Sequence, residues 1–355
     1  MEREAKLFEL KAESFDIARG VELAVVMFVP LLVLKLQGSP QYWLSFVFAI
    51  LIATISDPGR DHPLSSRLQW MAGVAMVGAL STALAFALGG KNWVPVAVAA
   101  FALTLLSGLS AAYGKHVAKI GYLLTVWLMV SLYLPRSFAL VPWPIQPWAQ
   151  ALAFVAGGVL WMAVVSGLSS RHRAQQPPSE PPPKDSAMGF SQNLIVFSLL
   201  RATSVAIAVA IAWGFNVPEA FLMPVAALLV MKPGLHDSVF VGVQRVIGTL
   251  AGALVAAAFL TFVHDKYLLA LVIVVFAAIA GATKDVNLAV FCTFLGVTVL
   301  TALGIGQPGN LTDNWERVAW TLVGVLIGLG VIILAGLLKE GHGHIARVHK
   351  KSPAV

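Results

Sequence analysis

The chain is organised as a series of long apolar runs, separated by short polar segments in which charged residues, glycine and proline gather. A helix that crosses a bilayer needs about 20 consecutive apolar residues, and most of these runs approach that length. The pattern therefore predicts an all-α integral membrane protein with twelve membrane-spanning helices, one of them unusually short. We expect these helices at 17–36, 41–57, 68–88, 94–113, 117–134, 148–169, 194–215, 219–231, 239–263, 267–283, 287–304 and 315–338.

A proline-rich polar segment, 171–190, divides the runs into six before it and six after it. Such a composition is typical of a solvated, semi-extended linker. The predicted organisation is a first transmembrane half at 1–170, the linker, a second half at 191–338, and a basic tail at 339–355.

Several landmarks occur in the same order in both halves, which indicates that the halves are copies. An even number of spans gives both copies the same orientation, as in parallel repeats about an axis along the membrane normal. The matching landmarks are Arg19 with Arg201, Asp57-Pro58-Gly59 with Lys232-Pro233-Gly234, Gly73 with Gly248, Lys115 with Lys284, Trp148 with Trp315, and Gly157 with Gly324.

Composition agrees with a membrane protein and excludes several other classes. Hydrophobic residues make up 58% of the chain and charged residues 12%, and the mean hydropathy is +0.83. A soluble domain carries about 25% charged residues. The single cysteine, Cys292, excludes a disulfide framework and a cysteine-rich metal site. No sequence motif of a hydrolase, nucleotide-binding protein or zinc enzyme occurs, so we expect no enzymatic activity, no cofactor and no metal.

The net charge of +7 becomes a topology signal when it is placed on the predicted spans. With the N-terminus in the cytoplasm, all but five of the 24 lysines and arginines fall on the cytoplasmic side. Such an excess is the usual mark of cytoplasmic loops. The pattern predicts that both termini and the linker are cytoplasmic, and it gives no indication of a nucleic-acid partner.

The pattern Arg-Val-x-x-Thr-Leu-x-Gly occurs twice, at 245–252 and 317–324. On a helix its Arg, Thr and Gly share one face. Arginines at a hydrocarbon boundary usually face a bundle interior, a cavity or water, so the pattern points to an anion inside the membrane. The alternative is a pair of interfacial arginines that extend to lipid headgroups beside ordinary glycine packing faces. The two helices run in opposite directions, which indicates either an inverted repeat within each half or a chance similarity.

These residues, together with Arg201 and Lys232-Pro233, resemble the fusaric acid resistance (FUSC), or aromatic acid exporter, family. The plant aluminium-activated malate transporters look distantly similar. The resemblance implies six-helix units that move organic anions across membranes, and some members work with a periplasmic adaptor. The first half departs from the pattern, because Trp70 stands in the place of Arg245 and Gln150 in that of Arg317. We therefore expect the anion contacts mainly in the second half, with Arg67 as a partial substitute in the first.

The expected function is export of small organic anions, chiefly aromatic carboxylic acids, across a bacterial inner membrane. A proton gradient or the membrane potential would drive it. The expected partners are the anion, the lipid bilayer and a periplasmic adaptor. A passive organic-anion channel and a non-transporting membrane scaffold remain as alternatives. The expected substrate-binding residues are Arg201, Arg245, Arg317, Lys232, Thr249 and Thr321, and the expected helix-packing residues are Gly248, Gly252, Gly324 and Gly328.

Overall fold

The computed structural model describes most of both halves of the chain. The described residues are 15–37, 40–57, 62–88, 92–138, 146–172, 189–215, 221–231, 235–305, 316 and 319–334. Among them every regular element is a helix, as the hydrophobic pattern predicts.

The helices follow the predicted apolar runs closely. In chain order they are α2 (Ile17–Gln37), α3 (Pro40–Ser56), α4 (Leu64–Leu88), α5 (Trp93–Leu109), the short 3-10 helix η2 (Ser110–Tyr113), α6 (Lys115–Phe138), α7 (Pro147–His172), α8 (Gln192–Gly214), α9 (Leu222–Val230), α10 (Leu235–Phe262), α11 (Lys266–Thr283), α12 (Leu288–Gly304) and a final helix, Ala319–Leu334. The short run near 219–231 corresponds to α9, which is also the shortest α-helix among those described.

Polar residues in the connections determine where several helices begin. The Ser191 hydroxyl accepts a hydrogen bond from the Leu194 amide at the start of α8. Asp265 caps α11 and Asn287 caps α12, each through a side-chain oxygen that accepts two backbone amides. Such caps satisfy amide groups that the helix leaves without internal partners.

Within the described part of the chain, five helices are long and apolar enough to cross a membrane, and further apolar helices are shorter. The five segments are Leu64–Leu88, Trp93–Tyr113, Pro147–Gly167, Gln192–Gly214 and Lys266–Thr283. Large hydrophobic side chains are exposed along several of them. Their lengths and outward apolar surfaces fit a multi-pass membrane protein.

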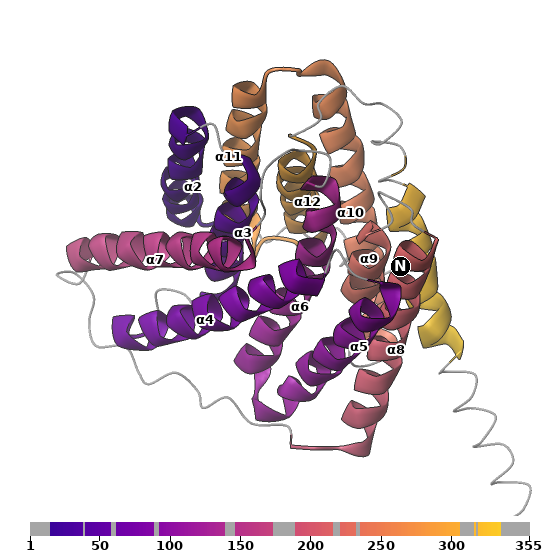
Figure 1. Cartoon of the computed structure of the whole chain (residues 1–355). Coiled ribbons are helices and arrows are strands. Elements are labelled where there is room, and N and C mark those ends of the chain that lie inside the picture. Colours follow the sequence, from indigo (N-terminus) through magenta and orange to yellow (C-terminus); the bar gives the residue numbers. More distant parts are fainter. Residues whose placement is uncertain are drawn as a thin grey trace, which may run out of the picture.

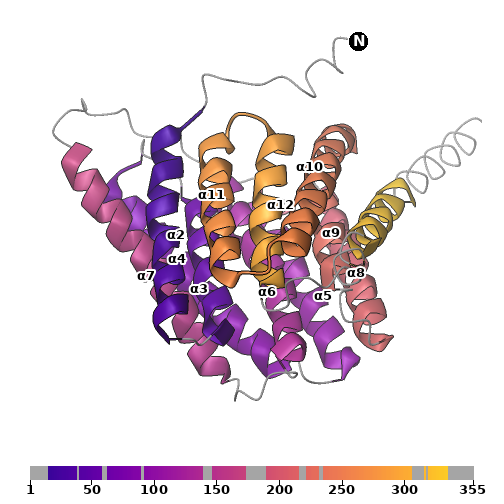
Figure 2. The ribbon, with the colours of Figure 1, turned by 90° about the horizontal axis from the view of Figure 1, so that it is seen from above.

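The helices form two rows that follow the same order of neighbours. In one row α2 packs on α11, α11 on α12, and α12 on α10, as Figure 2 shows. In the other row α8 packs on α5, α5 on α6, and α6 on α4. Each row therefore joins the opening helix of one half to three helices of the other half. Figure 1 shows α7 beside α4, and α7 also packs on α3.

Helices α3 and α9 lie between the two rows. Helix α3 contacts α2 and α11 of one row and α4 and α6 of the other, and α9 contacts α8, α6 and α10. The core beside α3 includes Trp127 of α6, which is fully buried and stacks on Phe48 at 4.7 Å between ring centroids. Its indole nitrogen donates a hydrogen bond of 2.7 Å to the Thr82 hydroxyl. A buried tryptophan usually finds such a partner for its polar atom.

Glycines stand where helix backbones approach most closely. Gly248 and Gly252 of α10 lie against the backbone of α12, at the carbonyls of Ala289 and Thr293. Gly324 and Gly328 of the final helix lie in the same way against the backbone of α9. A methyl group at any of these positions would push the two helices apart, which is why small residues mark such contacts.

Candidate functional site

Arg201 is a charged side chain buried inside an apolar helix. It is the tenth residue of α8, and its exposed fraction is only 5%. Its guanidinium carbon lies 5.1 Å from the centroid of the Tyr122 ring, which α6 supplies. Stacking on an aromatic face stabilises a cation where water is scarce. The sequence identified Arg201 as a candidate but gave no sign that Tyr122 would lie beside it.

Buried hydroxyl groups accompany Arg201 along the packing of α8 against α5. The helices are close, because Gly108 of α5 lies directly against Ser198, one turn before Arg201. On α5, Thr104 lies four residues before Gly108 and Ser107 lies one residue before it. On α8, Ser204 lies one turn after Arg201. Their side chains are buried, and within the described part of the chain their hydroxyl oxygens have no hydrogen-bond partner. We call Thr104, Ser107, Ser198, Arg201 and Ser204 the α5–α8 polar strip.

A cavity of about 240 Å³ opens between α4, α5 and α6 next to this strip. Ser107 belongs to both, and Gly121, which precedes Tyr122, also lines the cavity. The walls are mostly apolar, with hydroxyl groups from Ser81, Ser107, Ser110 and Thr125. Ligand sites are commonly apolar with a few placed polar groups. The signal that sequence reading missed is the spacing of Thr104, Ser107 and Gly108, in which Thr104 shares a helix face with each of the other two.

The remaining predicted substrate residues are placed only in part. Thr249 is half-buried on α10, and Thr321 is buried in the final helix, with 3% of its surface exposed. The structure thus puts these two threonines on different helices from Arg201, which belongs to the α8–α5 packing. Lys232 and Arg317 lie outside the described residues, and so does the side chain of Arg245 on α10.

The first-half counterparts of these arginines have their own polar partners. Gln150, in the place of Arg317, is buried and accepts a hydrogen bond of 2.6 Å from the Ser45 hydroxyl. Arg67, expected as a partial anion contact, forms a buried two-point ion pair with Asp57. Its Nε lies 2.9 Å from Oδ1 of Asp57, and its Nη2 lies 2.5 Å from Oδ2. This carboxylate occupies the part of the Arg67 guanidinium that a substrate anion would use.

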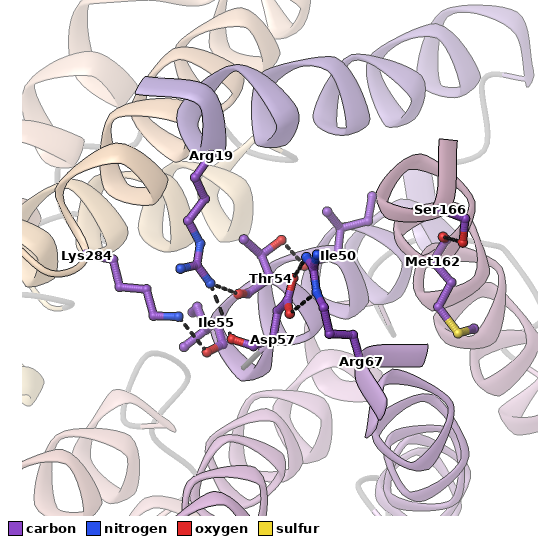
Figure 3. Close-up of polar contacts among 9 residues, drawn as sticks. All are labelled: Arg19, Ile50, Thr54, Ile55, Asp57, Arg67, Met162, Ser166 and Lys284. Carbon is purple, nitrogen blue, oxygen red and sulfur yellow. Dashed lines mark hydrogen bonds and ion pairs between the residues drawn. The ribbon is translucent and has the colours of Figure 1, made fainter. Parts of the chain in front are cut away.

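A second group of cations surrounds the C-terminal end of α3 (Figure 3). Nη2 of Arg19 donates to the carbonyl oxygens of Thr54 at 2.9 Å and Asp57 at 3.4 Å. Nζ of Lys284 donates to the carbonyl oxygen of Ile55 at 3.0 Å. Carbonyls in the last turn of a helix lack internal partners and carry partial negative charge, so cations are favourable there.

Lys119 of α6 completes this group, because its ammonium can donate a hydrogen bond to the side chain of Lys284 when that amine is neutral. Lys284 stands just beyond the end of α11. Burial lowers the pKa of Lys284 to about 6, and the positive charges of Arg19 and Lys119 act in the same direction. A lysine with such a pKa loses its proton near neutral pH. We call Arg19, Lys119 and Lys284 the α3-end cation cluster.

Comparison with protein families gives a match within the second half of the chain. Residues 194–331 match the family described as fusaric acid resistance protein-like. The match runs from α8 into the final helix and confirms the family resemblance inferred from the sequence. A role in membrane transport or efflux follows at the level of the family. Neither the search of curated proteins nor the search of solved structures gave a match.

Proposed function

We propose that this protein exports small organic anions, in particular aromatic carboxylic acids, across a bacterial inner membrane. The observation that carries the proposal is Arg201, buried inside α8 and stacked over Tyr122. A charged side chain at membrane depth is costly and by default marks a substrate or ion path. Its guanidinium offers a planar, two-point match to a carboxylate.

The α5–α8 polar strip supports a path for a polar solute. Thr104, Ser107 and Ser204 have buried hydroxyls with no hydrogen-bond partner among the described residues. Buried polar atoms in native proteins are nearly always hydrogen-bonded, so such a group of exceptions favours contact with water or a ligand. The adjoining apolar cavity would accept the ring of an aromatic acid while its carboxylate is held by Arg201.

We further propose that the two halves are parallel six-helix repeats with exchanged opening helices. The matching neighbour order of the two rows supports this, because α2 replaces α8 when the halves are interchanged. Gly157 of α7 lies against the Phe46 carbonyl and the Ala49 side chain of α3. Gly324 lies in the same way against α9, at the Met223 carbonyl and the Ala226 side chain, which are also three residues apart. Alternating access would then be a movement of one row relative to the other.

The driving force of the exporter would be the membrane potential, the proton gradient or both. An anion that leaves a cell gains about 2.3 kcal/mol per charge for 100 mV, inside negative. That potential alone therefore sustains a concentration ratio of roughly fiftyfold. Arg245 and Arg317 are proposed to add positive potential to the same path, and a periplasmic adaptor would be a further partner.

Efflux from proteoliposomes tests the proposed function. Vesicles with the full chain would be loaded with radiolabelled benzoate, and efflux would be followed under an imposed potential or pH gradient. Loss of one charge-assisted contact weakens binding by about tenfold to a hundredfold, so Arg201→Ala should raise the half-saturating concentration by that factor. Arg201→Lys should recover only part of the loss. Lys266→Ala removes an exposed cation at the start of α11 and serves as the matched control.

The alternatives predict different results in the same assay. Benzoate-independent conductance of the wild-type protein would indicate a passive channel. A scaffold would give no benzoate flux, and its cellular phenotype would survive Arg201→Ala but not removal of the tail at 339–355. Folded Arg201→Ala protein that transports like the wild type would exclude Arg201 from the anion path.

A further inference from the structure

We propose that the cavity between α4, α5 and α6 opens sideways into the bilayer, and that the aromatic acid enters it from the hydrocarbon of the cytoplasmic leaflet. This inference rests on the proposed function, because it names the side from which that substrate arrives. The cavity has a volume of about 240 Å³, and Ser107 belongs both to its wall and to the α5–α8 polar strip. Ser107 thus joins the cavity to the strip that contains Arg201.

The opening arises from the way in which the three helices pack. Helices α4 and α5 each pack on α6, and Figure 1 shows α6 between them. Within the described residues, α4 and α5 make at most marginal contact with each other. Side chains fill the space between packed helices, whereas two helices that share a neighbour without meeting leave a groove over it. The cavity occupies this groove, with Val77 and Ser81 from α4 and Leu124 and Leu128 from α6 in its walls.

The rim of the cavity belongs to the apolar outer surface of the protein. Val77 of α4 is 49% exposed and Leu106 of α5 is 61% exposed, and both line the cavity. Met76 and Leu80 extend the exposed apolar surface along α4. Helices α4 and α5 lie in two of the segments that are long and apolar enough to cross a membrane. Such a surface faces lipid tails, so the cavity opens into hydrocarbon.

The position of the cavity along α6 agrees with this environment. Gly121 and Leu128, which both line it, are the seventh and fourteenth residues of the helix. At 1.5 Å per residue they lie roughly 9 and 20 Å from its start. The hydrocarbon core of a bilayer is about 30 Å thick, so the cavity extends from near its boundary toward its middle. With both termini in the cytoplasm, α6 starts on the cytoplasmic side, where an exporter collects its substrate.

The walls fit an aromatic acid better than a lipid tail. Ser107 is buried, and its hydroxyl has no hydrogen-bond partner among the described residues. A carboxylate accepts a hydrogen bond from such a hydroxyl, whereas an acyl chain leaves it without one. Tyr122 follows Gly121 of the wall and lies beneath the Arg201 guanidinium, at 5.1 Å from the ring centroid. An apolar cavity of about 150 Å³ already holds benzene, so this one has room for a ring and its carboxyl group.

The side of the opening can be measured without transport. A nitroxide would be attached to Ser81→Cys, inside the cavity, in a Cys292→Ala background, and the full chain would be placed in liposomes. Molecular oxygen concentrates in hydrocarbon, whereas a polar nickel complex stays in water. The label should collide with oxygen as a label at Met76→Cys on the outer surface does. Collision mainly with nickel, as expected for Tyr113→Cys at the exposed end of η2, or with neither reagent, would overturn the lateral opening.

Bulky side chains at the rim test whether the acid uses this opening. Val77→Trp and Leu106→Trp should each lower the initial rate of benzoate efflux by about tenfold, the factor that a misfit of about 1.4 kcal/mol produces. Met76→Trp and Val98→Trp are the matched controls, since both positions are exposed on the same two helices and neither lines the cavity. The controls should transport like the wild type. Thermal unfolding of all four variants would show that each keeps the fold.

The two arms separate failure of this inference from failure of the proposed function. Rim variants that export benzoate at the rate of their controls would overturn lateral entry and leave export intact. A label at position 81 that meets oxygen in a protein whose rim variants behave in this way would assign the cavity to a lipid tail. A wild type that moves no benzoate would refute export and the entry of this substrate together, while the label would still establish on which side the cavity opens.

Discussion

At the scale of single residues, the polar side chains in this apolar protein have two distinct kinds of environment. Arg67 meets a carboxylate in a two-point contact, with both partners buried. Arg201 is equally buried but lies over an aromatic ring. The first contact pairs two opposite charges, whereas the second places a cation over a ring that carries no formal charge. This difference makes Arg201 the better functional candidate of the two.

We predict that Arg67→Ala acts through stability. Removing one partner of a buried ion pair leaves Asp57 uncompensated and typically costs about 3–5 kcal/mol. The variant should therefore show a clear drop in thermal unfolding temperature in detergent. Asp57→Asn/Arg67→Gln, which replaces both charges by amides, should recover part of the loss.

Arg245→Ala at equal expression should impair transport per folded molecule more than Arg67→Ala. The reverse order would place the anion contacts in the first half.

At the scale of elements, close helix pairs depend on glycine where one backbone faces another. Gly324 lies against the Met223 carbonyl, and Gly157 lies against the Phe46 carbonyl. At both positions an added methyl group would also meet an alanine three residues further along the partner helix, Ala226 or Ala49. The carbonyl is part of the helix backbone and cannot rotate away, so the helices themselves would have to separate.

Alanine substitutions at these glycines test both the packing and the proposed repeat. Gly324→Ala and Gly157→Ala should each destabilise the protein by about 1–3 kcal/mol through overpacking. Gly330→Ala and Gly167→Ala, where an added methyl group meets nothing within 4 Å, are matched controls on the same two helices. The controls should be neutral or slightly stabilising, since alanine favours a helix by up to about 1 kcal/mol over glycine. Strongly unequal effects of Gly157→Ala and Gly324→Ala would contradict equivalent halves.

At the scale of the whole molecule, residues distant in sequence converge at one end of the helices. The polar region of Figure 3 is formed by the start of α2, the end of α3, the start of α4 and the end of α11. Lys119, near the start of α6, adjoins Lys284 in this region. Because successive helices alternate in direction, all of these helix ends lie on the same side of the helix bundle. That face is the one the positive-inside rule assigns to the cytoplasm.

Cysteine labelling of intact cells tests this orientation. Single cysteines would be introduced in a Cys292→Ala background, and a membrane-impermeant maleimide would be added from outside. Positions in 135–147 and 305–314 should react, and position 180 in the linker should react only after the cells are permeabilised. Labelling of position 180 in intact cells would invert the topology and place the α3-end cation cluster on the outer face.

Sequence alone determined the class of this protein and most of its helices. Apolar runs of span length force the backbone to satisfy its own hydrogen bonds, and in a membrane-like interior the helix is the local solution. The short α9 and the glycine contacts followed from run length and residue size, which are local properties. The family could be inferred from the second half because its short Arg, Thr and Gly motifs keep their spacing.

Only the tertiary structure decided which charges meet. Arg67 and Asp57 are ten residues apart, but their pairing depends on the turn between α3 and α4. Lys284 reaches Ile55 across 229 positions of sequence. The exchange of opening helices brings α2 to α11 and α8 to α5, and no hydrophobic pattern encodes it, because every helix has enough apolar surface to pack on several others. Whether a cation is structural or functional depends on this packing, because the packing decides which groups lie opposite it.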